Sequence, residues 1–340
     1  MQEVRIVVDV MGGDEEPQVV LDGIEAALEE DKALTVLATG PEDVVASFCE
    51  AHERAEALVA PDVITMEDDP ITAVMRKRKS SIVIGCRAVK RGNADGFFSA
   101  GSTGAITAAG TAYVTPMRYV DVDGSKRPIR PCLANPVPNR AGGETVLADM
   151  GANPDVEPED IVRFAQMASA YARIVCGIEN PRVGLLSNGT EEHKGSAFTK
   201  ECFPLMVASV PGFVGNCEGS SITDGSFDVV VADGFAGNIA LKSIEGAAKL
   251  LLTELKGAIY GSLKGKIAGL LLKSEMGALK AKLSGDSHGG AILLGLRGVV
   301  LIGHGATSVE AVKNGTLAAA EAVRERLVQN VAESMENIVL

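Results

Sequence analysis

The 340-residue chain has a formal net charge of −13, with 46% hydrophobic residues, 4% aromatic residues and 38 glycines. A chain of this length buries about 75% of the surface that it exposes when unfolded, so its core needs neither a disulfide nor a metal. This composition excludes a disordered or fibrous protein and is typical of a loop-rich α/β protein. The acidic balance also argues against general nucleic-acid binding, because the phosphate backbone would be repelled.

The first residues, MQEVRIVVDV, indicate a strand and lack a charged segment followed by a long apolar run. We therefore expect no signal peptide and a cytoplasmic location. The six cysteines are scattered, with no C-x-x-C pair and no grouping with the four histidines. This spacing argues against a zinc site or a disulfide framework, and we expect reduced thiols that mostly fill the core.

Six apolar runs predict β-strands, at 4–10, 34–40, 95–101, 144–151, 182–189 and 227–234. Their continuous hydrophobicity is typical of strands buried on both faces, as in a parallel sheet covered by helices. The sequence therefore predicts a doubly wound α/β fold with a mainly parallel sheet, as a single domain over residues 1–340. We interpret the Pro-rich region 116–138 as a long connection or as the seam between two subdomains.

Ligands of such sheets bind beyond the carboxyl ends of the strands, where glycines let the backbone approach them. Two strand-end loops are rich in glycine, and they contribute Gly12, Gly13 and Asp14, with Asp9 beside them, and Gly101, Ser102, Thr103 and Gly104. Their N–H groups and hydroxyls could hold an anion. A tight turn and a capped helix start are the simpler alternatives.

Three further loops add charged and polar side chains, namely Glu191, His193 and Lys194 from 188–195, Asp233 and Asn238 from 233–238, and His304 from 303–307. Lys194 could neutralise a phosphate or a developing oxyanion. Helix capping is the alternative for Asp233 and Asn238, and His304 is as readily structural as catalytic. No Walker loop, G-x-S-x-G elbow or G-x-G-x-x-G follows the first strand. The pattern fits a reaction whose nucleophile arrives as a substrate.

The segment SLKGKIAGLLLKSEMGALKAKL (262–283) carries five lysines and one glutamate around three consecutive leucines. On a helical wheel, one apolar stripe contains Leu252, Leu255, Ile259, Leu263, Ile267, Leu270 and Leu271, and the opposite side contains Leu272, Met276, Leu279 and Leu283. One straight helix cannot present both sets to one partner. The sequence predicts a helix from near Asn238, a break at 271–274 and an antiparallel return, forming a protruding helical hairpin over about 240–285.

An apolar hairpin tip between lysines suits an interface, and three alternatives stay open. The residues concerned are Leu270, Leu271 and Leu272 with Lys264, Lys266 and Lys273. They could contact a membrane surface or an acidic protein partner. The leucines could instead pack between two copies of the chain, or the lysines could simply solvate isolated helices.

Six motifs occur in the same order as in the bacterial phosphate acyltransferase family, and they are D-x-M-G-G-D-x-x-P (9–17), SAGSTGA (99–105), LADMGAN (147–153), NGTEEHKG (188–195), DVVVADGFAGNIALKSIEG (228–246) and GGAILLGLRGVVLIGHGATS (289–308). The resemblance covers nearly the whole chain, and the joint occurrence is very specific. The chain departs from the usual pattern at Val10, Ser102 and Ser187. Lys194 and Gly195 fall on fixed motif positions, whereas several polar residues are tolerated at His193.

The resemblance implies an isocitrate/isopropylmalate dehydrogenase-like fold and transfer of a fatty acyl group from acyl carrier protein to inorganic phosphate, for phospholipid synthesis, with no cofactor or metal. It implies catalytic roles for Ser102, Lys194, Asp233 and Asn238, phosphate contacts from residues 12–14 and 101–104, and further candidates at Asp9, Asn153, Glu191 and His304. The implied partners are acyl carrier protein, a second copy of the chain and the inner membrane face, with a membrane glycerol-3-phosphate acyltransferase. A metal-dependent dehydrogenase of the same fold and a non-catalytic acyl-binding or lipid-binding scaffold are the alternatives.

Overall fold

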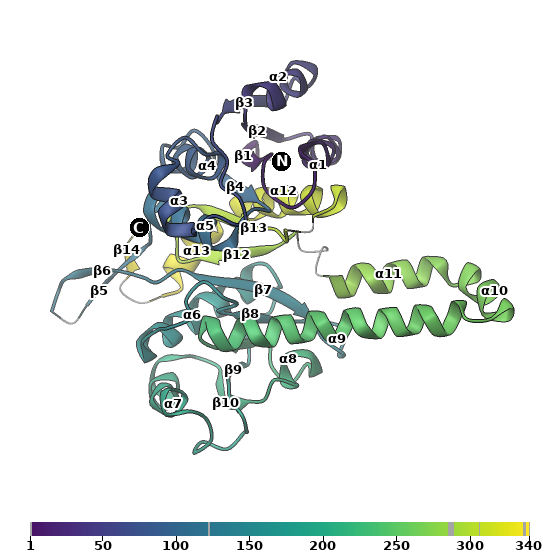
Figure 1. The fold of residues 1–340 in the computed structure, drawn as a ribbon. Helices are drawn as coiled ribbons and strands as arrows, with labels where there is room; N and C mark the ends of the chain where they lie inside the picture. The colour runs from purple at the N-terminus through teal and green to yellow at the C-terminus, as the bar shows by residue number, and fades with distance from the viewer. Residues whose placement is uncertain (1, 122, 285–288, 306, 336–337, 340) are drawn as a thin grey trace.

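The computed structural model of the protein describes residues 2–121, 123–284, 289–305, 307–335 and 338–339 (Figure 1). Its centre is an 11-stranded sheet in the order β10-β9-β11-β8-β7-β12-β13-β4-β1-β2-β3. The strands of this sheet are β1 (Val4–Asp9), β2 (Leu34–Gly40), β3 (Ala55–Val59), β4 (Gly96–Ser99), β7 (Cys132–Pro138), β8 (Glu144–Ala148), β9 (Val183–Leu186), β10 (Phe213–Cys217), β11 (Val229–Val231), β12 (Ala291–Leu294) and β13 (Val299–Ile302). A small second sheet contains β5 (Arg118–Val120), β6 (Lys126–Pro128) and β14 (Ile338–Val339).

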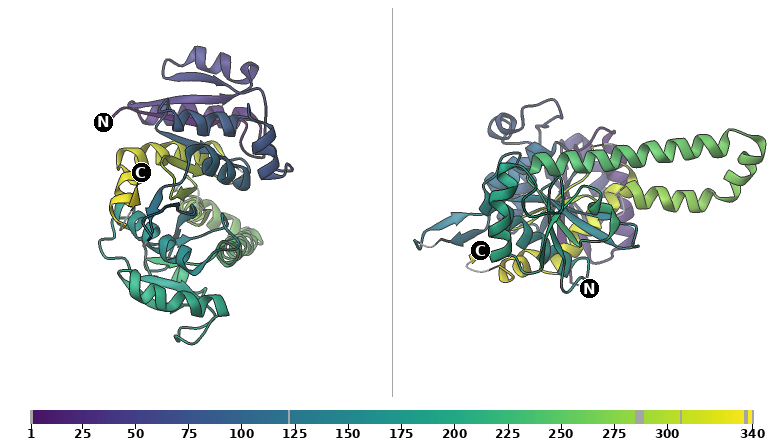
Figure 2. Two further views of the ribbon diagram at one scale, coloured as in Figure 1. Left: turned by 90° about the vertical axis from the view of Figure 1, so that its left-hand side faces the viewer. Right: turned by 90° about the horizontal axis from the view of Figure 1, so that it is seen from below.

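The helices cover both faces of the large sheet (Figures 1 and 2). They are α1 (Pro17–Glu30), α2 (Glu42–Ala51), α3 (Pro70–Arg76), α4 (Ser81–Lys90), α5 (Thr103–Ala109), the π-helix η1 (Gly110–Val114), α6 (Pro158–Ile174), α7 (Ala197–Ser209), α8 (Ser221–Asp224), α9 (Gly234–Tyr260), α10 (Leu263–Leu271), α11 (Lys273–Ser284), α12 (Val309–Arg324) and α13 (Leu327–Glu333). In the half of the sheet that contains β1, helices α1 and α12 pack on one face and α4 packs on the other.

The core consists of two apolar layers, one on each face of the sheet. Successive side chains of a strand point to opposite faces, and β1 illustrates this, because Ile6 and Val8 belong to one layer and Val7 to the other. All six runs predicted to be strands contain one, namely β1, β2, β4, β8, β9 and β11. The predicted doubly wound and mainly parallel α/β fold is confirmed.

The Pro-rich region 116–138 is more than the connection that the sequence suggested, because it contains β7, an interior strand of the sheet. Both β7 and β12 are antiparallel to their two neighbours. Following these pairings across the sheet, β8, β11, β9 and β10 run opposite in sense to β13, β4, β1, β2 and β3. Two parallel halves therefore meet at the central pair β7 and β12.

A helical hairpin projects from the body of the protein, as Figure 1 and the right-hand view of Figure 2 show. It consists of the outer part of α9 with α10 and α11, and α11 returns alongside α9. The predicted break at 271–274 is present, since α10 ends at Leu271 and α11 begins at Lys273. A second break, which the sequence did not predict, follows Tyr260, where the hydroxyl oxygen of Ser262 accepts a hydrogen bond from Gly265 N and caps α10.

The predicted stripe of leucines is largely exposed at the hairpin tip. The exposed fractions of Leu270 and Leu271 are 73% and 74%. The side chains of Leu263, from the first stripe, and Leu283, from the opposite stripe, lie outside the described part of the structure. Among the described residues, no helix is both long and apolar enough to span a lipid bilayer.

Candidate active site

A cavity of about 470 Å³ lies between α9 and the central strand β7. Its α9 wall is formed by Asn238, Leu241, Lys242, Ile244, Glu245 and Ala248, and its β7 wall by Leu133, Asn135, Pro136, Val137 and Pro138. Glycines from three strand ends, Gly101, Gly151 and Gly303, border the same space. The volume falls within the range of about 300–1,000 Å³ that is usual for small-molecule sites, and the lining combines apolar side chains with a few polar groups.

One border of the cavity is built from three loops that are tied together. The Asp9 carboxylate accepts a hydrogen bond from the Ser99 hydroxyl at 2.7 Å, and the same hydroxyl oxygen accepts one from Gly101 N at 3.1 Å. Asp14 N donates to the carbonyl oxygen of Gly305 at 2.8 Å. Burial raises the pKa of Asp9. Asp9 is therefore a buried structural residue that positions the backbone of the glycine loop at 101–104.

Gly12 shows why this border requires glycine. A Cβ atom there would lie 2.9 Å from Gly101 N and 2.8 Å from the Ser99 hydroxyl, too close for any larger residue. The backbones of loops 9–14 and 99–104 therefore touch directly.

The opposite border depends on the fully buried carboxylate of Asp149. It accepts hydrogen bonds from Leu133 N at 2.9 Å and from the backbone N–H groups of residues 151–153 at 2.8–3.2 Å. Burial raises its pKa, and these donors oppose that effect by stabilising the charged form. The carboxylate thereby fixes a loop of glycine and small residues against the first residues of β7.

The start of α9 packs against this loop. Gly234 N donates to the carbonyl oxygen of Asn153 at 2.8 Å, and a methyl group on Gly237 would overlap the carbonyl oxygen of Asp149. Asn238 consequently lies beside Gly151, which has a φ of 131°. The glycines allow helix and loop to approach closely enough to place Asn238 at the cavity.

A polar bridge crosses the cavity from α9 to the loop after β13. The Glu245 carboxylate accepts a hydrogen bond from Lys242 Nζ at 2.8 Å, and its other oxygen lies 3.1 Å from His304 Nε2. The contact with His304, followed by that with Lys242, lowers the pKa of Glu245 to about 2. The sequence singled out His304, but neither Lys242 nor Glu245. Their spacing of three residues on an amphipathic helix is the signal that would have placed them on one face.

Asn135 on β7 is the most unusual residue of the lining. The residue is 6% exposed, and its amide oxygen has no hydrogen-bond partner in the described structure. A buried polar atom of this kind costs free energy unless a ligand or water satisfies it. Sequence analysis missed Asn135, because two prolines close to it argued against a central strand.

Four of the residues predicted from the sequence line the cavity, and they are Gly101, Thr103, Asn238 and His304. Several others hold local structure. Ser102 caps α5 by accepting from Ala105 N, Asp233 caps α9 by accepting from Ala236 N at 2.7 Å, and Asn153 donates to Pro131 O at 2.7 Å. The capping alternative is thus realised for Ser102 and Asp233, and their catalytic roles stay predictions.

Lys194 and Glu191 do not line the cavity. Gly195 N donates to the Asn188 side chain at 2.9 Å and closes their loop, and Glu191 O accepts from the Asn216 side chain of β10 at 2.9 Å. The loop follows β9, which is separated from β8 only by the parallel strand β11. Two strand spacings amount to about 10 Å. Lys194 therefore lies at the same sheet edge as Gly151, outside the cavity.

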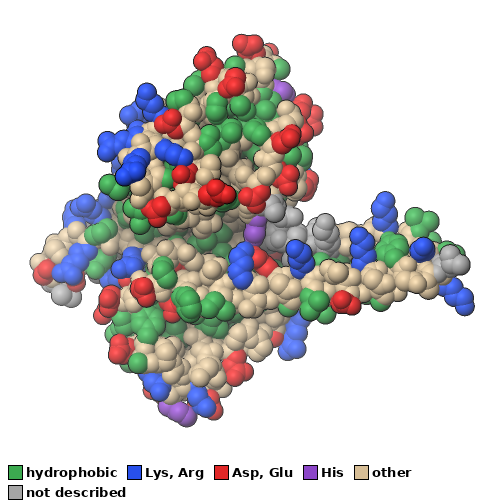
Figure 3. Space-filling view, in the orientation of Figure 1, with side chains coloured by type: hydrophobic (Ala, Val, Ile, Leu, Met, Phe, Trp, Pro, Cys, Tyr) green, Lys and Arg blue, Asp and Glu red, His purple; other side chains and the backbone are tan. Residues whose placement is uncertain are grey.

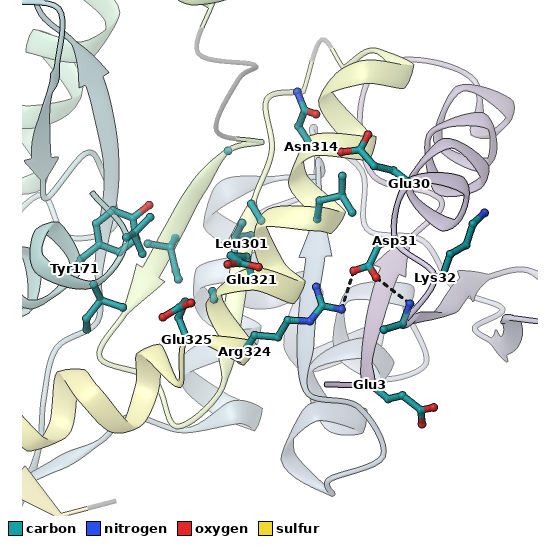
Figure 4. A pocket seen from close by; sticks show the side chains of 18 residues that line it. Glu3, Glu30, Asp31, Lys32, Tyr171, Leu301, Asn314, Glu321, Arg324 and Glu325 are labelled. Carbon is teal, nitrogen blue, oxygen red and sulfur yellow. Dashed lines mark hydrogen bonds and ion pairs between the residues drawn. The ribbon is translucent and has the colours of Figure 1, made fainter. Parts of the chain in front are cut away.

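A second cavity, of about 1,140 Å³, lies between the two halves and is lined by α6, α12 and the turn after α1 (Figure 4). Its best-defined feature is the ion pair of Asp31 and Arg324, whose charged atoms are 2.7 Å apart. Of its described lining residues, Gly290 is the only glycine. Among the described residues no group of three or more His, Cys, Asp or Glu side chains could hold a metal ion.

Solved structures with the same fold include phosphotransacylases. The phosphotransacetylase of Streptococcus pyogenes superimposes with a TM-score of 0.59 at 15% identity, covering 95% of this chain and 94% of that chain. A branched-chain phosphotransacylase of Enterococcus faecalis gives a TM-score of 0.53 at 14% identity, covering 94% and 99%. At these identities the likeness establishes the fold alone, and the fold is that of the phosphotransacetylases.

Sequence comparison identifies the family. A family model described as "Fatty acid synthesis protein" matches residues 4–330. The phosphate acyltransferase of Lacticaseibacillus casei is 41% identical over 332 residues, covering 97% of this chain and 95% of that protein, and that of Staphylococcus aureus is 38% identical over 333 residues, covering 98% of each. The chain belongs to the phosphate acyltransferase family, as the motifs indicated, and it is an acyltransferase.

The close contact between α9 and the Asp149 loop predicts that a Gly→Ala substitution changes the free energy of unfolding in opposite directions at two positions of α9. Gly237→Ala should lower the free energy of unfolding by about 2 kcal/mol, because the methyl group overlaps backbone. Gly246→Ala on the same helix meets nothing within 4 Å, and should raise it by roughly 0.5–1 kcal/mol, because alanine favours the helix. Urea unfolding measures both values, and equal effects would contradict the described contact.

Proposed function

We propose that this chain transfers a fatty acyl group from acyl carrier protein to inorganic phosphate, yielding an acyl phosphate for phospholipid synthesis. The observation that carries the proposal is the cavity itself, in which an apolar wall of α9 faces glycine loops and isolated polar groups. Its described lining contains neither Ser nor Cys. Membership in the phosphate acyltransferase family supports a mechanism in which phosphate is the nucleophile.

The chemistry requires no nucleophile from the protein. A phosphate oxygen attacks the thioester carbonyl carbon, the new C–O bond forms, and the C–S bond breaks to release the carrier thiol. Phosphate is anionic at neutral pH, and a thiol with a pKa of about 8.5 is a tolerable leaving group, which takes up the proton that phosphate loses. The protein has to align the two reactants and stabilise the oxyanion of the tetrahedral intermediate.

Each of these tasks has candidate groups at the cavity. The Thr103 hydroxyl is available to phosphate, with Gly12, Gly13, Asp14, Gly101 and Gly104 supporting its loop. Asn238 can donate from its side-chain amide to the oxyanion. The unpartnered Asn135 oxygen can accept a hydrogen bond from an amide N–H of the carrier's pantetheine arm. Lys194 lies at the end of β9, two strands from β8, and its charge can act on phosphate if the loop closes.

The proposal predicts phosphate-dependent release of free carrier thiol, together with a hydroxylamine-reactive acyl phosphate, when the protein is mixed with palmitoyl carrier protein. Asn238→Ala should lower kcat/KM about 100-fold, because one oxyanion donor is lost, and Lys194→Ala should lower it as well. His193→Ala, exposed in the same loop as Lys194, serves as the control and should leave it unchanged. A wild-type protein that forms no acyl phosphate would refute the proposal, and a change in NAD(P) absorbance would favour a dehydrogenase.

We further propose that the hairpin attaches the enzyme to the inner face of the membrane, where a glycerol-3-phosphate acyltransferase would receive the acyl phosphate. Leu270 and Leu271 are exposed at the tip, and Lys264, Lys266 and Lys273 flank them. Apolar side chains between lysines favour binding at the surface of an anionic bilayer. Along α9, Phe235, Ile239, Leu250 and Leu251 are also exposed, and these apolar side chains support a homodimer.

Two matched double substitutions separate the membrane contact from the dimer contact, since each replaces two exposed leucines by glutamates. Leu270→Glu with Leu271→Glu should abolish co-sedimentation with anionic liposomes and leave the sedimentation coefficient unchanged. Leu250→Glu with Leu251→Glu should dissociate the dimer in analytical ultracentrifugation. Unchanged liposome binding in the first variant would exclude membrane contact by the tip, and a monomeric wild type would exclude the dimer.

A further inference from the structure

A basic run stands out at α3 and α4. Residues 76–91 contain seven Lys or Arg residues and no Asp or Glu, in a chain whose net charge is −13. Figure 3 shows Lys and Arg side chains gathered on the part of the surface formed by α3 and α4. Such a local concentration of one charge creates a field opposite in sign to that of the rest of the protein.

Exposed apolar side chains lie beside this charge. On α3, Ile71 and Met75 are 66% and 63% exposed, although they are four residues apart and therefore share one face of the helix. The basic residues next to them are Arg76, Arg78, Lys79 and Arg87. These six residues are called the α3 patch below.

The charges of the α3 patch are available to a partner. Within the described part of the chain, Arg76, Arg78, Lys79 and Arg87 form no salt bridge, whereas Lys77 is paired with Asp68 at 2.6 Å. Arg78 Nε donates to the carbonyl oxygen of Met75 at 3.1 Å, and Arg87 donates to that of Arg78 at 3.2 Å. The Arg87 guanidinium also stacks over the Tyr113 ring, 4.6 Å from its centroid. These contacts orient the guanidinium groups and leave them without a carboxylate partner among the described residues.

The α3 patch adjoins the mouth of the active-site cavity. Met66, four residues before α3, lines the cavity and is itself exposed. Pro70, the first residue of α3, packs against Gly104 in the glycine loop, where a Cβ atom would lie 2.8 Å from the proline ring. From Pro70 to Arg76 the helix rises about 9 Å. A protein bound to the α3 patch therefore lies close to the cavity, at a distance comparable with the length of α3.

We propose that the α3 patch is the docking surface for the acidic carrier protein that delivers the acyl group, an inference that rests on the function proposed above. Its unpaired positive charges complement an acidic partner, and Ile71 with Met75 provides the apolar centre that a protein contact requires. The hairpin lysines suit this task less well. From Ala248, where the cavity ends on α9, to Tyr260 the helix extends about 18 Å further before the hairpin tip begins.

The test compares two triple charge reversals with the same change in net charge. The patch variant is Arg76→Glu, Arg78→Glu and Lys79→Glu, and the control variant is Lys126→Glu, Arg173→Glu and Lys200→Glu, all at exposed positions. The patch variant should raise KM for palmitoyl carrier protein about tenfold or more, whereas the control should change it less than twofold. For a palmitoyl thioester of pantetheine alone, the patch variant should match the wild type. A variant with three Gln residues at the patch positions should show a smaller rise, and it covers the case in which the reversals impair folding.

Direct binding separates this inference from the proposed chemistry. Fluorescence anisotropy with unacylated carrier protein should show wild-type binding that weakens with added salt, and a loss of about tenfold in the patch variant. Equal affinities of the wild type and the patch variant, or a larger loss in the control, would overturn the docking surface even if the enzyme forms acyl phosphate. If the patch variant bound the carrier protein as the wild type does but no longer bound phosphatidylglycerol vesicles, the α3 patch would be a membrane contact and the docking proposal would be wrong.

Discussion

The buried carboxylate of Asp149 is the interaction on which the candidate site depends. It gathers the N–H groups of residues 151–153 and that of Leu133 around one charge, and thereby ties the end of β8 to the start of β7. Burying a carboxylate without such donors would cost several kcal/mol. Because the loop is fixed, Gly237 can pack against it and the first turn of α9 acquires a defined position. The placement of Asn238 follows from this chain of contacts.

Helix α9 then links functions that lie far apart along the chain. Its first turns form the cavity wall, and Glu245 connects it to His304 in the other half of the sheet. Its outer turns carry the hairpin away from the body of the protein (Figure 1). The 27-residue helix α9 therefore joins the site to the hairpin tip that carries the proposed membrane contact. By contrast, the α3 patch lies beside the glycine loop, on the half of the sheet that contains β4.

Sequence patterns predicted what depends on local chemistry. Continuous apolar runs identified β1 and β4, and the phase change in the leucine stripe identified the turn at Leu272. The antiparallel centre was not predictable in this way, because β7 contains Pro136 and shows no clean periodicity, and its place is set by pairing with β8 and β12. The break at Ser262 was missed because a single serine cap among glycines interrupts the helix without disturbing the apolar pattern.

The site was predictable in its loops but not in its side chains. Strand-end glycines indicated the borders at residues 101–104, and the motif around Asn238 indicated the start of α9. Asn135, Lys242 and Glu245 enter the site through tertiary packing, which brings β7 and a helix face together. Lys194 shows the opposite case. Its charged loop was conspicuous in the sequence, but it lies two strands from the cavity. The proximity of strand ends in the sheet does not fix where a side chain points.

The central claim is that phosphate meets the acyl group in the cavity between α9 and β7. A crystal structure of the protein soaked in phosphate tests it most directly. The account predicts tetrahedral density within the cavity, in hydrogen-bonding contact with the loop at residues 101–103 or with the side chain of Asn238. Phosphate bound only at the loop 188–195, or in the cavity beside Arg324, would contradict the account.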